Sequence, residues 1–94
     1  MCIRDSYILY SLSADKYYVG QTDNLALRLK FHNELSEKSY TSKHRPWILK
    51  KYIEVKNRSE AVRVERMIKK RKSRKFIALL ISHPSEVEKL LEML

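Results

Sequence analysis

Residues 7–21 read YILYSLSADKYYVGQ, two apolar stretches separated by a polar one. The first stretch, residues 7–12, and the second, residues 17–21, are rich in aromatic and branched side chains, which favour β-strands. Residues 13–16 between them include Ser13 and Asp15, whose side chains hydrogen-bond to nearby backbone in turns. The segment therefore predicts a β-hairpin, and Gly20 at its end indicates a positive φ angle or the close approach of another group.

The pattern beyond the hairpin predicts one more strand and four helices. Residues 1–6 carry no strand pattern, so the first strand is expected to begin at Tyr7. The order β-β-α-β-α-α-α predicts an α+β domain, in which a small three-stranded antiparallel sheet is flanked by helices. The first downstream segments are a helix capped by Thr22 or Asp23 and running to about Glu34, a polar loop over residues 35–45, and a strand over residues 47–55 opened by Pro46. The next helix begins in a capping box at Asn57 and Glu60 and ends in the basic run 69–75. A helix from Ser73 through Ile81 and a short last helix capped by Ser85 and Glu88 complete the chain.

Length and composition exclude several classes of protein. Ninety-four residues, of which 44% are hydrophobic and 33% charged, predict one soluble domain over residues 1–94. The chain has no apolar run near the roughly 20 residues of a membrane span and no secretory pattern, so a cytoplasmic location is expected. Cys2 is the only cysteine and Gly20 the only glycine, which excludes an internal disulfide, a thiolate metal cage and a glycine-rich phosphate loop.

The positive charge is confined to the middle of the chain. The net charge is +9, but residues 42–75 alone hold fourteen Lys and Arg against three Glu, a net of +11. Such a concentration is typical of a surface that binds a polyanion, and nucleic acid is the expected partner. A solvated helix surface is the alternative interpretation.

Two polar side chains of the first predicted helix stand among apolar ones. At 100° per residue, Arg28 and His32 lie one turn apart, flanked by Leu25 and Phe31. They are expected at the edge of the core. Either they form part of a site, or the Arg28 stem covers apolar surface and His32 is a hydrogen-bonded core residue.

Glu65 raises the same question on the second long helix. It falls between Ala61 and Val62 on the edge of the apolar stripe, where a carboxylate is costly unless it is paired, protonated or bound to a metal. Arg63 and Arg66 lie on the far side, as does Lys70, so these three are poor partners and a salt bridge from elsewhere is the commonest outcome expected.

Four tyrosines lie on the predicted hairpin. Each taken singly is expected to pack rather than to react. Strand alternation puts Tyr17 and Tyr18 on opposite faces, so one of them must share a face with part of the strand that holds Tyr7. The four residues are Tyr7, Tyr10, Tyr17 and Tyr18.

These residues in this order resemble the GIY-YIG endonuclease superfamily, in particular its small single-domain bacterial group related to the UvrC N-terminal nuclease. The resemblance rests on Tyr7-Ile8-Leu9-Tyr10, Tyr18-Val19-Gly20, Arg28-x-x-x-His32, and the run from Arg58-Ser59-Glu60-Ala61 to Glu65. It covers residues 7–81, which are expected to form the core, with residues 82–94 as a C-terminal helix.

The resemblance implies roles for five residues. Tyr7 and Tyr18 match the tyrosines of the two family tripeptides, Arg28 the helix arginine, and His32 a position that is His or Tyr. Glu65 matches the ligand of a single divalent metal, Mg²⁺ or alternatively Mn²⁺, that bridges to the scissile phosphate. A water activated by Tyr or His attacks, leaving 5′-phosphate and 3′-hydroxyl ends.

The same resemblance implies a DNA endonuclease that is structure-specific or weakly sequence-specific, acts in repair or recombination, and is a monomer or weak dimer. Asp5-Ser6 replaces the family's Gly-Ile, and a downstream helix Asn has no counterpart among residues 77–79. A non-catalytic nucleic-acid-binding module that kept the fold is therefore the alternative; RNA as the ligand and a basic ribosome-associated protein also stay open. The expected phosphate contacts are Lys43, Arg45, Lys69, Lys70, Arg71, Lys72, Arg74 and Lys75.

Overall fold

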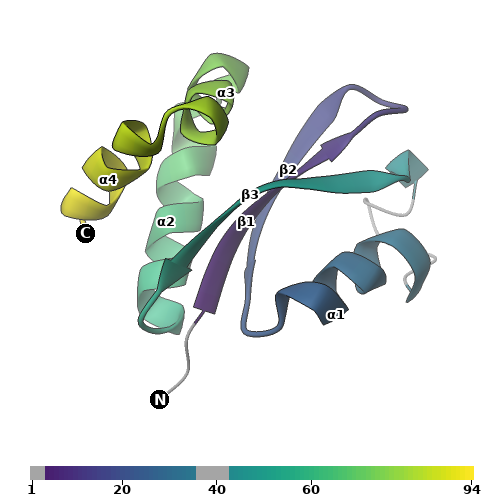
Figure 1. The fold of residues 1–94 in the computed structure, drawn as a ribbon, viewed down its shortest axis with the longest axis horizontal. Helices are drawn as coiled ribbons and strands as arrows, with labels where there is room; N and C mark the ends of the chain where they lie inside the picture. The colour runs from purple at the N-terminus through teal and green to yellow at the C-terminus, as the bar shows by residue number, and fades with distance from the viewer. Residues whose placement is uncertain (1–3, 36–42) are drawn as a thin grey trace.

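A three-stranded antiparallel sheet with the strand order β2-β1-β3 forms the centre of the computed structural model (Figure 1). The structure describes residues 4–35 and 43–94, so Cys2 and most of the predicted loop lie outside the described residues. The predicted fold class and element order are confirmed. The elements are β1 (Arg4–Ser11), β2 (Lys16–Thr22), α1 (Leu25–Lys30), a π-helical turn η1 (Phe31–Leu35), β3 (Trp47–Val55), α2 (Arg58–Arg71), α3 (Arg74–Ser82) and α4 (Pro84–Glu92).

Helices cover both faces of the sheet. Figure 1 shows α1 on one side and α2, α3 and α4 on the other. The larger core lies under α2 and includes Ile8 and Val19, whereas the smaller one lies under α1 and includes Tyr7, Leu9 and Trp47. Because β1 is central and covered on both faces, it is apolar at consecutive positions rather than at alternate ones.

A β-bulge changes the face that β3 presents to each core. Ile8 pairs with Lys51 and Leu9 with Leu49, so Lys50 is the extra residue on β3. Trp47 and Leu49 therefore belong to the core under α1, while the apolar odd-numbered residues beyond the bulge join the core under α2. These are Ile53 and Val55.

Side-chain caps begin three of the four α-helices in the described part of the chain. Asn57 accepts a hydrogen bond from the Glu60 N–H and Ser73 accepts one from Phe76, which confirms both predicted caps. Glu60 reaches back to the N–H of Lys56 rather than of Asn57, so the capping box is displaced by one residue. In α1 the cap is Asn24, because Thr22 ends β2 and its hydroxyl instead accepts from the Asn24 N–H.

Predicted boundaries of α1, β1 and α4 were wrong; the helix predicted to run to about Glu34 ends as α1 at Lys30 and continues as the π-helical turn η1. β1 begins at Arg4 rather than at Tyr7, because Arg4 pairs with Val55 and extends the ladder beyond the apolar run. Leu12, predicted in that strand, lies exposed in the turn. α4 begins at Pro84, with His83 in place of Ser85 as its cap residue. Proline is favoured at a first helical position because the N–H it lacks has no partner there.

The described residues include no helix that is long and apolar enough to cross a membrane.

Candidate active site

Tyr7 is the buried centre of the candidate site. It lies in the middle of β1 with 1% of its surface exposed and is paired with Gly20 on β2. A Cβ at position 20 would lie 2.5 Å from the Tyr7 hydroxyl oxygen and 2.6 Å from Cζ. Gly20 does not have a positive φ, so of the two explanations expected for this glycine, close approach is the one that holds.

The π-helical turn after α1 places His32 next to the Tyr7 hydroxyl. Nε2 of His32 lies 2.9 Å from the Tyr7 hydroxyl, and the imidazole is 1% exposed. Asn33 ties this turn to the start of β3, because its side chain accepts from the Trp47 N–H and donates to the Trp47 carbonyl. The Arg45 Nε donates to the His32 carbonyl at 2.7 Å. His32 is thus deeply buried and fixed, and not at an open edge.

Arg28 approaches the same hydroxyl from α1. Its Nε donates to the Tyr7 oxygen at 3.4 Å, and its guanidinium lies 4.5 Å from the centre of the Phe31 ring. The hydrogen bond with Tyr7, and then the interaction with Tyr18, raise the pKa of Arg28, so the side chain stays a cation. A cation is therefore held where negative charge on an oxyanion would develop.

The protonation states at this centre follow from the surroundings. Burial, followed by the charges of Arg28 and Arg45, lowers the pKa of His32 from 6.5 to about 4, so the imidazole is neutral at neutral pH. Arg28 can only donate a hydrogen bond, so the Tyr7 oxygen accepts from it. When the His32 proton is on Nδ1, the Tyr7 hydroxyl donates its hydrogen to Nε2. Burial raises the pKa of Tyr7 and Arg28 opposes that rise, so Tyr7 rests as a neutral phenol.

Tyr18 completes the aromatic part of the cluster on the same face. Its ring centre lies 4.9 Å from His32, 6.1 Å from Trp47 and 6.4 Å from Tyr7. Tyr17 instead packs against the core under α2, as strand alternation predicts. Lys69 reaches across from α2, with its Nζ 5.7 Å from the Tyr18 ring centre.

Glu65 comes to the cluster from α2. Ala61, Val64 and Ile68 bury the apolar stripe of this helix against the sheet, and the half-buried Glu65 carboxylate lies beside the stripe. Its charge is among the factors that raise the pKa of Tyr7. A salt bridge from elsewhere was expected, but the partner comes from the same helix, because Lys69 lies 3.6 Å from Glu65. This is the i,i+4 spacing of helical ion pairs.

The donor set suits a hard divalent cation held partly by substrate. The described residues contain no group of three or more His, Cys, Asp or Glu side chains that would enclose a metal ion. Mg²⁺ prefers oxygen ligands and keeps several waters, so one carboxylate and a substrate phosphate are enough to hold it. Glu65 offers that carboxylate, and the phenol oxygens add no soft ligand.

The candidate phosphate contacts fall into two groups. Lys43 is exposed just before β3, close in sequence to Arg45, whose Nε is bonded to the His32 carbonyl. Arg74 is held by Asp15 at 2.8 Å and Arg71 lies over the Phe76 ring, so neither presents an unengaged guanidinium. The second group lies around the junction of α2 and α3, where Arg71 and Arg74 are joined by Lys69, Lys70, Lys72 and Lys75.

Two features of the site were missed from the sequence. Asn33 fixes the turn that carries His32, but a lone Asn beside a polar loop gives no signal of a bond to Trp47. Lys69 pairs with Glu65 and covers Tyr18, and its position four residues after Glu65 was a usable signal.

Comparison with known proteins finds one family that matches most of the chain. The family model of the GIY-YIG catalytic domain matches residues 6–77, an interval that contains all five clustered residues. No curated protein and no solved structure gives a significant match. The five residues are Tyr7, Tyr18, Arg28, His32 and Glu65.

Proposed function

The chain belongs to the GIY-YIG family, and from this premise we propose that it is a metal-dependent endonuclease that hydrolyses phosphodiester bonds in DNA. The observation that supports this most is the hydroxyl of Tyr7, which is bonded to both His32 and Arg28. A buried phenol between a neutral base and a fixed cation is suited to moving a proton while negative charge develops beside it.

Tyr7 and His32 act together on the attacking water in this proposal. The Tyr7 oxygen takes a proton from water while its own proton passes to Nε2 of His32, 2.9 Å away. The oxygen of the water forms a bond to phosphorus, and the bond to the 3′ oxygen breaks. That oxygen takes a proton from solvent, which leaves 5′-phosphate and 3′-hydroxyl ends.

In this proposal Arg28 and Glu65 place positive charge beside the phosphate, Arg28 directly and Glu65 by holding a metal ion. The Arg28 cation stabilises the additional negative charge of the transition state. Glu65 would hold a divalent ion, Mg²⁺ or Mn²⁺, which when bound would polarise the phosphate and lower the pKa of a bound water. Tyr18 packs against His32 and lies under Lys69. In this proposal its hydroxyl contacts the phosphate.

The basic residues at the junction of α2 and α3 supply affinity for the DNA backbone in this proposal. Phosphate contacts of this kind carry little sequence information, so we propose recognition of DNA structure or weak sequence specificity. Such an activity suits DNA repair or recombination. The domain core would be residues 7–81.

A cleavage assay tests the proposal. Plasmid, flap and single-stranded DNA are incubated with the protein in Mg²⁺, Mn²⁺ or EDTA, beside Glu65→Ala and the matched surface variant Glu88→Ala. We expect nicks with 5′-phosphate ends that require metal, that are lost in Glu65→Ala and that persist in Glu88→Ala. Cleavage that survives Glu65→Ala or EDTA contradicts the assignment, and binding without cleavage supports the non-catalytic module.

A further inference from the structure

A hollow lies beside the candidate active site, where the edge of β2 meets the junction of α2 and α3. Its volume is about 350 Å³, within the range of small-molecule sites. Tyr17, Ile68 and Ile77 give it an apolar lining, and Lys69 and Lys72 stand on its rim. In the proposed function Lys69 and Lys72 contribute affinity for the DNA backbone, and neither isoleucine has a part in it.

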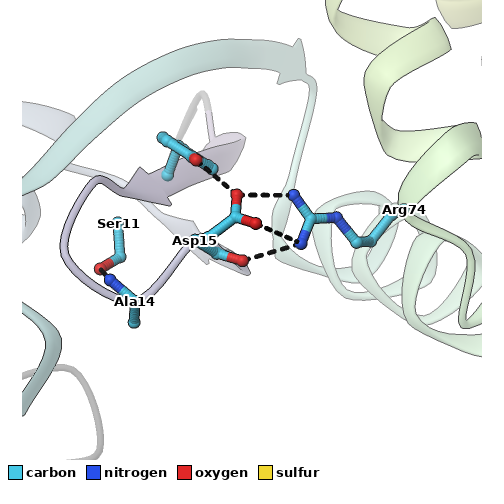
Figure 2. A network of polar contacts seen from close by, with 5 residues as sticks. Ser11, Ala14, Asp15 and Arg74 are labelled. Carbon is cyan, nitrogen blue, oxygen red and sulfur yellow. Dashed lines mark hydrogen bonds and ion pairs between the residues drawn. The ribbon is translucent and has the colours of Figure 1, made fainter.

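An ion pair fixes one wall of this hollow. Figure 2 shows the Asp15 carboxylate facing the guanidinium of Arg74. Nη2 of Arg74 donates to Oδ1 of Asp15 at 2.8 Å. Arg74 also donates to the Asp15 carbonyl at 2.8 Å, so the tip of the hairpin is held against the start of α3. Because Arg74 is neutralised by this pair, an anion in the hollow would meet Lys72 and also Lys69, whose ammonium lies 3.6 Å from Glu65 and would be shared between the two anions.

The lining and the rim together select a ligand that is flat and apolar at one end and anionic at the other. Aromatic and aliphatic side chains favour a planar ring, and ammonium groups favour a phosphate. A nucleotide has both parts. Inorganic phosphate alone would leave the apolar lining exposed, and an apolar peptide would bring no anion to Lys72.

The hollow is continuous with the candidate active site. Tyr18 lines it and also lies against His32, and Lys69 lines it and also pairs with Glu65. A DNA strand whose phosphate reaches Glu65 and Tyr7 would therefore bring its neighbouring nucleotide to the hollow around the edge of β2.

We propose that this hollow receives the base of an unpaired nucleotide next to the cleaved bond, with a phosphate of the same strand at Lys69 and Lys72. The inference rests on the proposed function and names its substrate class as DNA with a single-stranded segment at the cleavage site. A base inside a duplex is stacked and paired, so it reaches the hollow only at the cost of unstacking.

Binding in EDTA tests the inference separately from cleavage. Fluorescence anisotropy measures the Kd of a labelled oligothymidylate and of a blunt duplex of equal length. Ile77→Trp fills the hollow from a half-buried position, and we expect it to weaken single-strand binding at least fivefold while duplex binding changes less than twofold. An unchanged ratio of the two Kd values overturns the inference. Thermal melting verifies that the variant is folded.

A second variant keeps the test independent of packing. Lys72 has a left-handed backbone with φ of 50°, which Asn tolerates, so Lys72→Asn removes charge without strain. The matched control is Lys75→Asn, outside the hollow. We expect Lys75→Asn to weaken both DNA forms equally and Lys72→Asn to weaken the single strand about threefold more than the duplex. Equal losses in both variants contradict the inference.

Competition identifies what the hollow recognises. Thymidine monophosphate is expected to displace the oligothymidylate at a lower concentration than inorganic phosphate does, and equal potency overturns the inference by indicating an anion site only. Loss of cleavage in Mg²⁺ with these preferences intact would contradict the proposed function but leave the nucleotide site standing. Cleavage in Mg²⁺ without these preferences would contradict the nucleotide site but leave the proposed function standing.

Discussion

Tyr7 and Gly20 lie directly opposite each other on β1 and β2, and the tyrosine ring occupies the space that a side chain at position 20 would need. A Cβ there would come within 2.5 Å of the hydroxyl oxygen. Because the backbone of Gly20 has no positive φ, the glycine is required for space and not for conformation. The hairpin thus sets the position of the hydroxyl that His32 and Arg28 contact.

Gly20→Ala is expected to displace the Tyr7 ring. The ring is buried and its hydroxyl oxygen would lie 2.5 Å from the new methyl group, so we expect a loss of about 1–3 kcal/mol in stability. Displacement of the hydroxyl is expected to lower cleavage about 100-fold. Denaturant unfolding and plasmid nicking measure the two effects. Gln21→Ala, on the same strand, is the control, and wild-type cleavage by Gly20→Ala would contradict the role of this contact.

Tyr7→Phe is expected to keep the fold and lose most of the activity. The ring stays, but Nε2 of the buried His32 loses its hydrogen-bond partner, at a cost of about 1–3 kcal/mol. Loss of the proton-transfer group is expected to slow cleavage by about 10²- to 10⁴-fold. Tyr10→Phe removes the other tyrosine hydroxyl of β1, which is bonded to Asp15 on the surface, and should cleave normally. Equal cleavage rates for Tyr7→Phe and Tyr10→Phe would show that the Tyr7 hydroxyl does not take part in the reaction.

Lys69→Met is expected to strengthen metal binding at Glu65. The lysine ammonium lies 3.6 Å from the carboxylate and both groups are partly solvated, so the competing cation weakens metal binding only moderately. We expect the Kd for Mn²⁺, measured by electron paramagnetic resonance, to fall about two- to fivefold. Lys70→Met removes an equal charge from the next position of the helix and should change this Kd much less. Weaker Mn²⁺ binding in Lys69→Met would show that the lysine supports the metal site.

The fold was largely predictable because its elements are bounded by local signals. The hairpin follows from residues 7–21, and the β3 bounds match residues 47–55 because Pro46 and Asn57 enclose a run of strand-forming side chains. What could not be predicted depends on pairing between distant segments. The bulge at Lys50 exists because β3 must face two different cores, and β1 extends to Arg4 because Val55 is there to pair with it.

The candidate site was predictable as a set of residues but not as an arrangement. Helical spacing placed Arg28 and His32 among apolar neighbours, yet a regular helix does not describe the π-helical turn that carries His32. That turn is fixed by Asn33 and the Trp47 backbone, 14 residues apart, which no local pattern reports. The Glu65 to Lys69 pair was accessible from spacing alone.

Stability is expected to fall with pH below neutrality because of His32. Its pKa is about 4 in the fold and 6.5 when exposed, so the unfolded chain binds the additional proton between these values. The contribution is therefore fully present above pH 6.5 and lost as the pH falls towards 4. The shift corresponds to a loss of the order of 3 kcal/mol.

The pH dependence of urea unfolding measures this loss. His32→Gln removes the titrating group, so its stability is expected to vary less between pH 4 and 6.5. His83→Gln alters an exposed histidine and should keep the wild-type dependence. An identical dependence in His32→Gln and wild type would contradict the assignment to His32.

Asp15→Asn is expected to tighten DNA binding by releasing a cation. The carboxylate forms two contacts with the guanidinium of Arg74, at 2.8 and 3.3 Å, and Asn keeps the positive φ of 53° at this turn without strain. Once Asp15 is neutral, Arg74 adds its charge to the basic junction of α2 and α3. We expect the slope of log K against log salt to steepen by about 1, with affinity rising several-fold at low salt. Glu88→Gln makes the same charge change on α4 and should leave the slope near wild type, so an equal steepening in both variants would mean that overall charge, and not Arg74, is responsible.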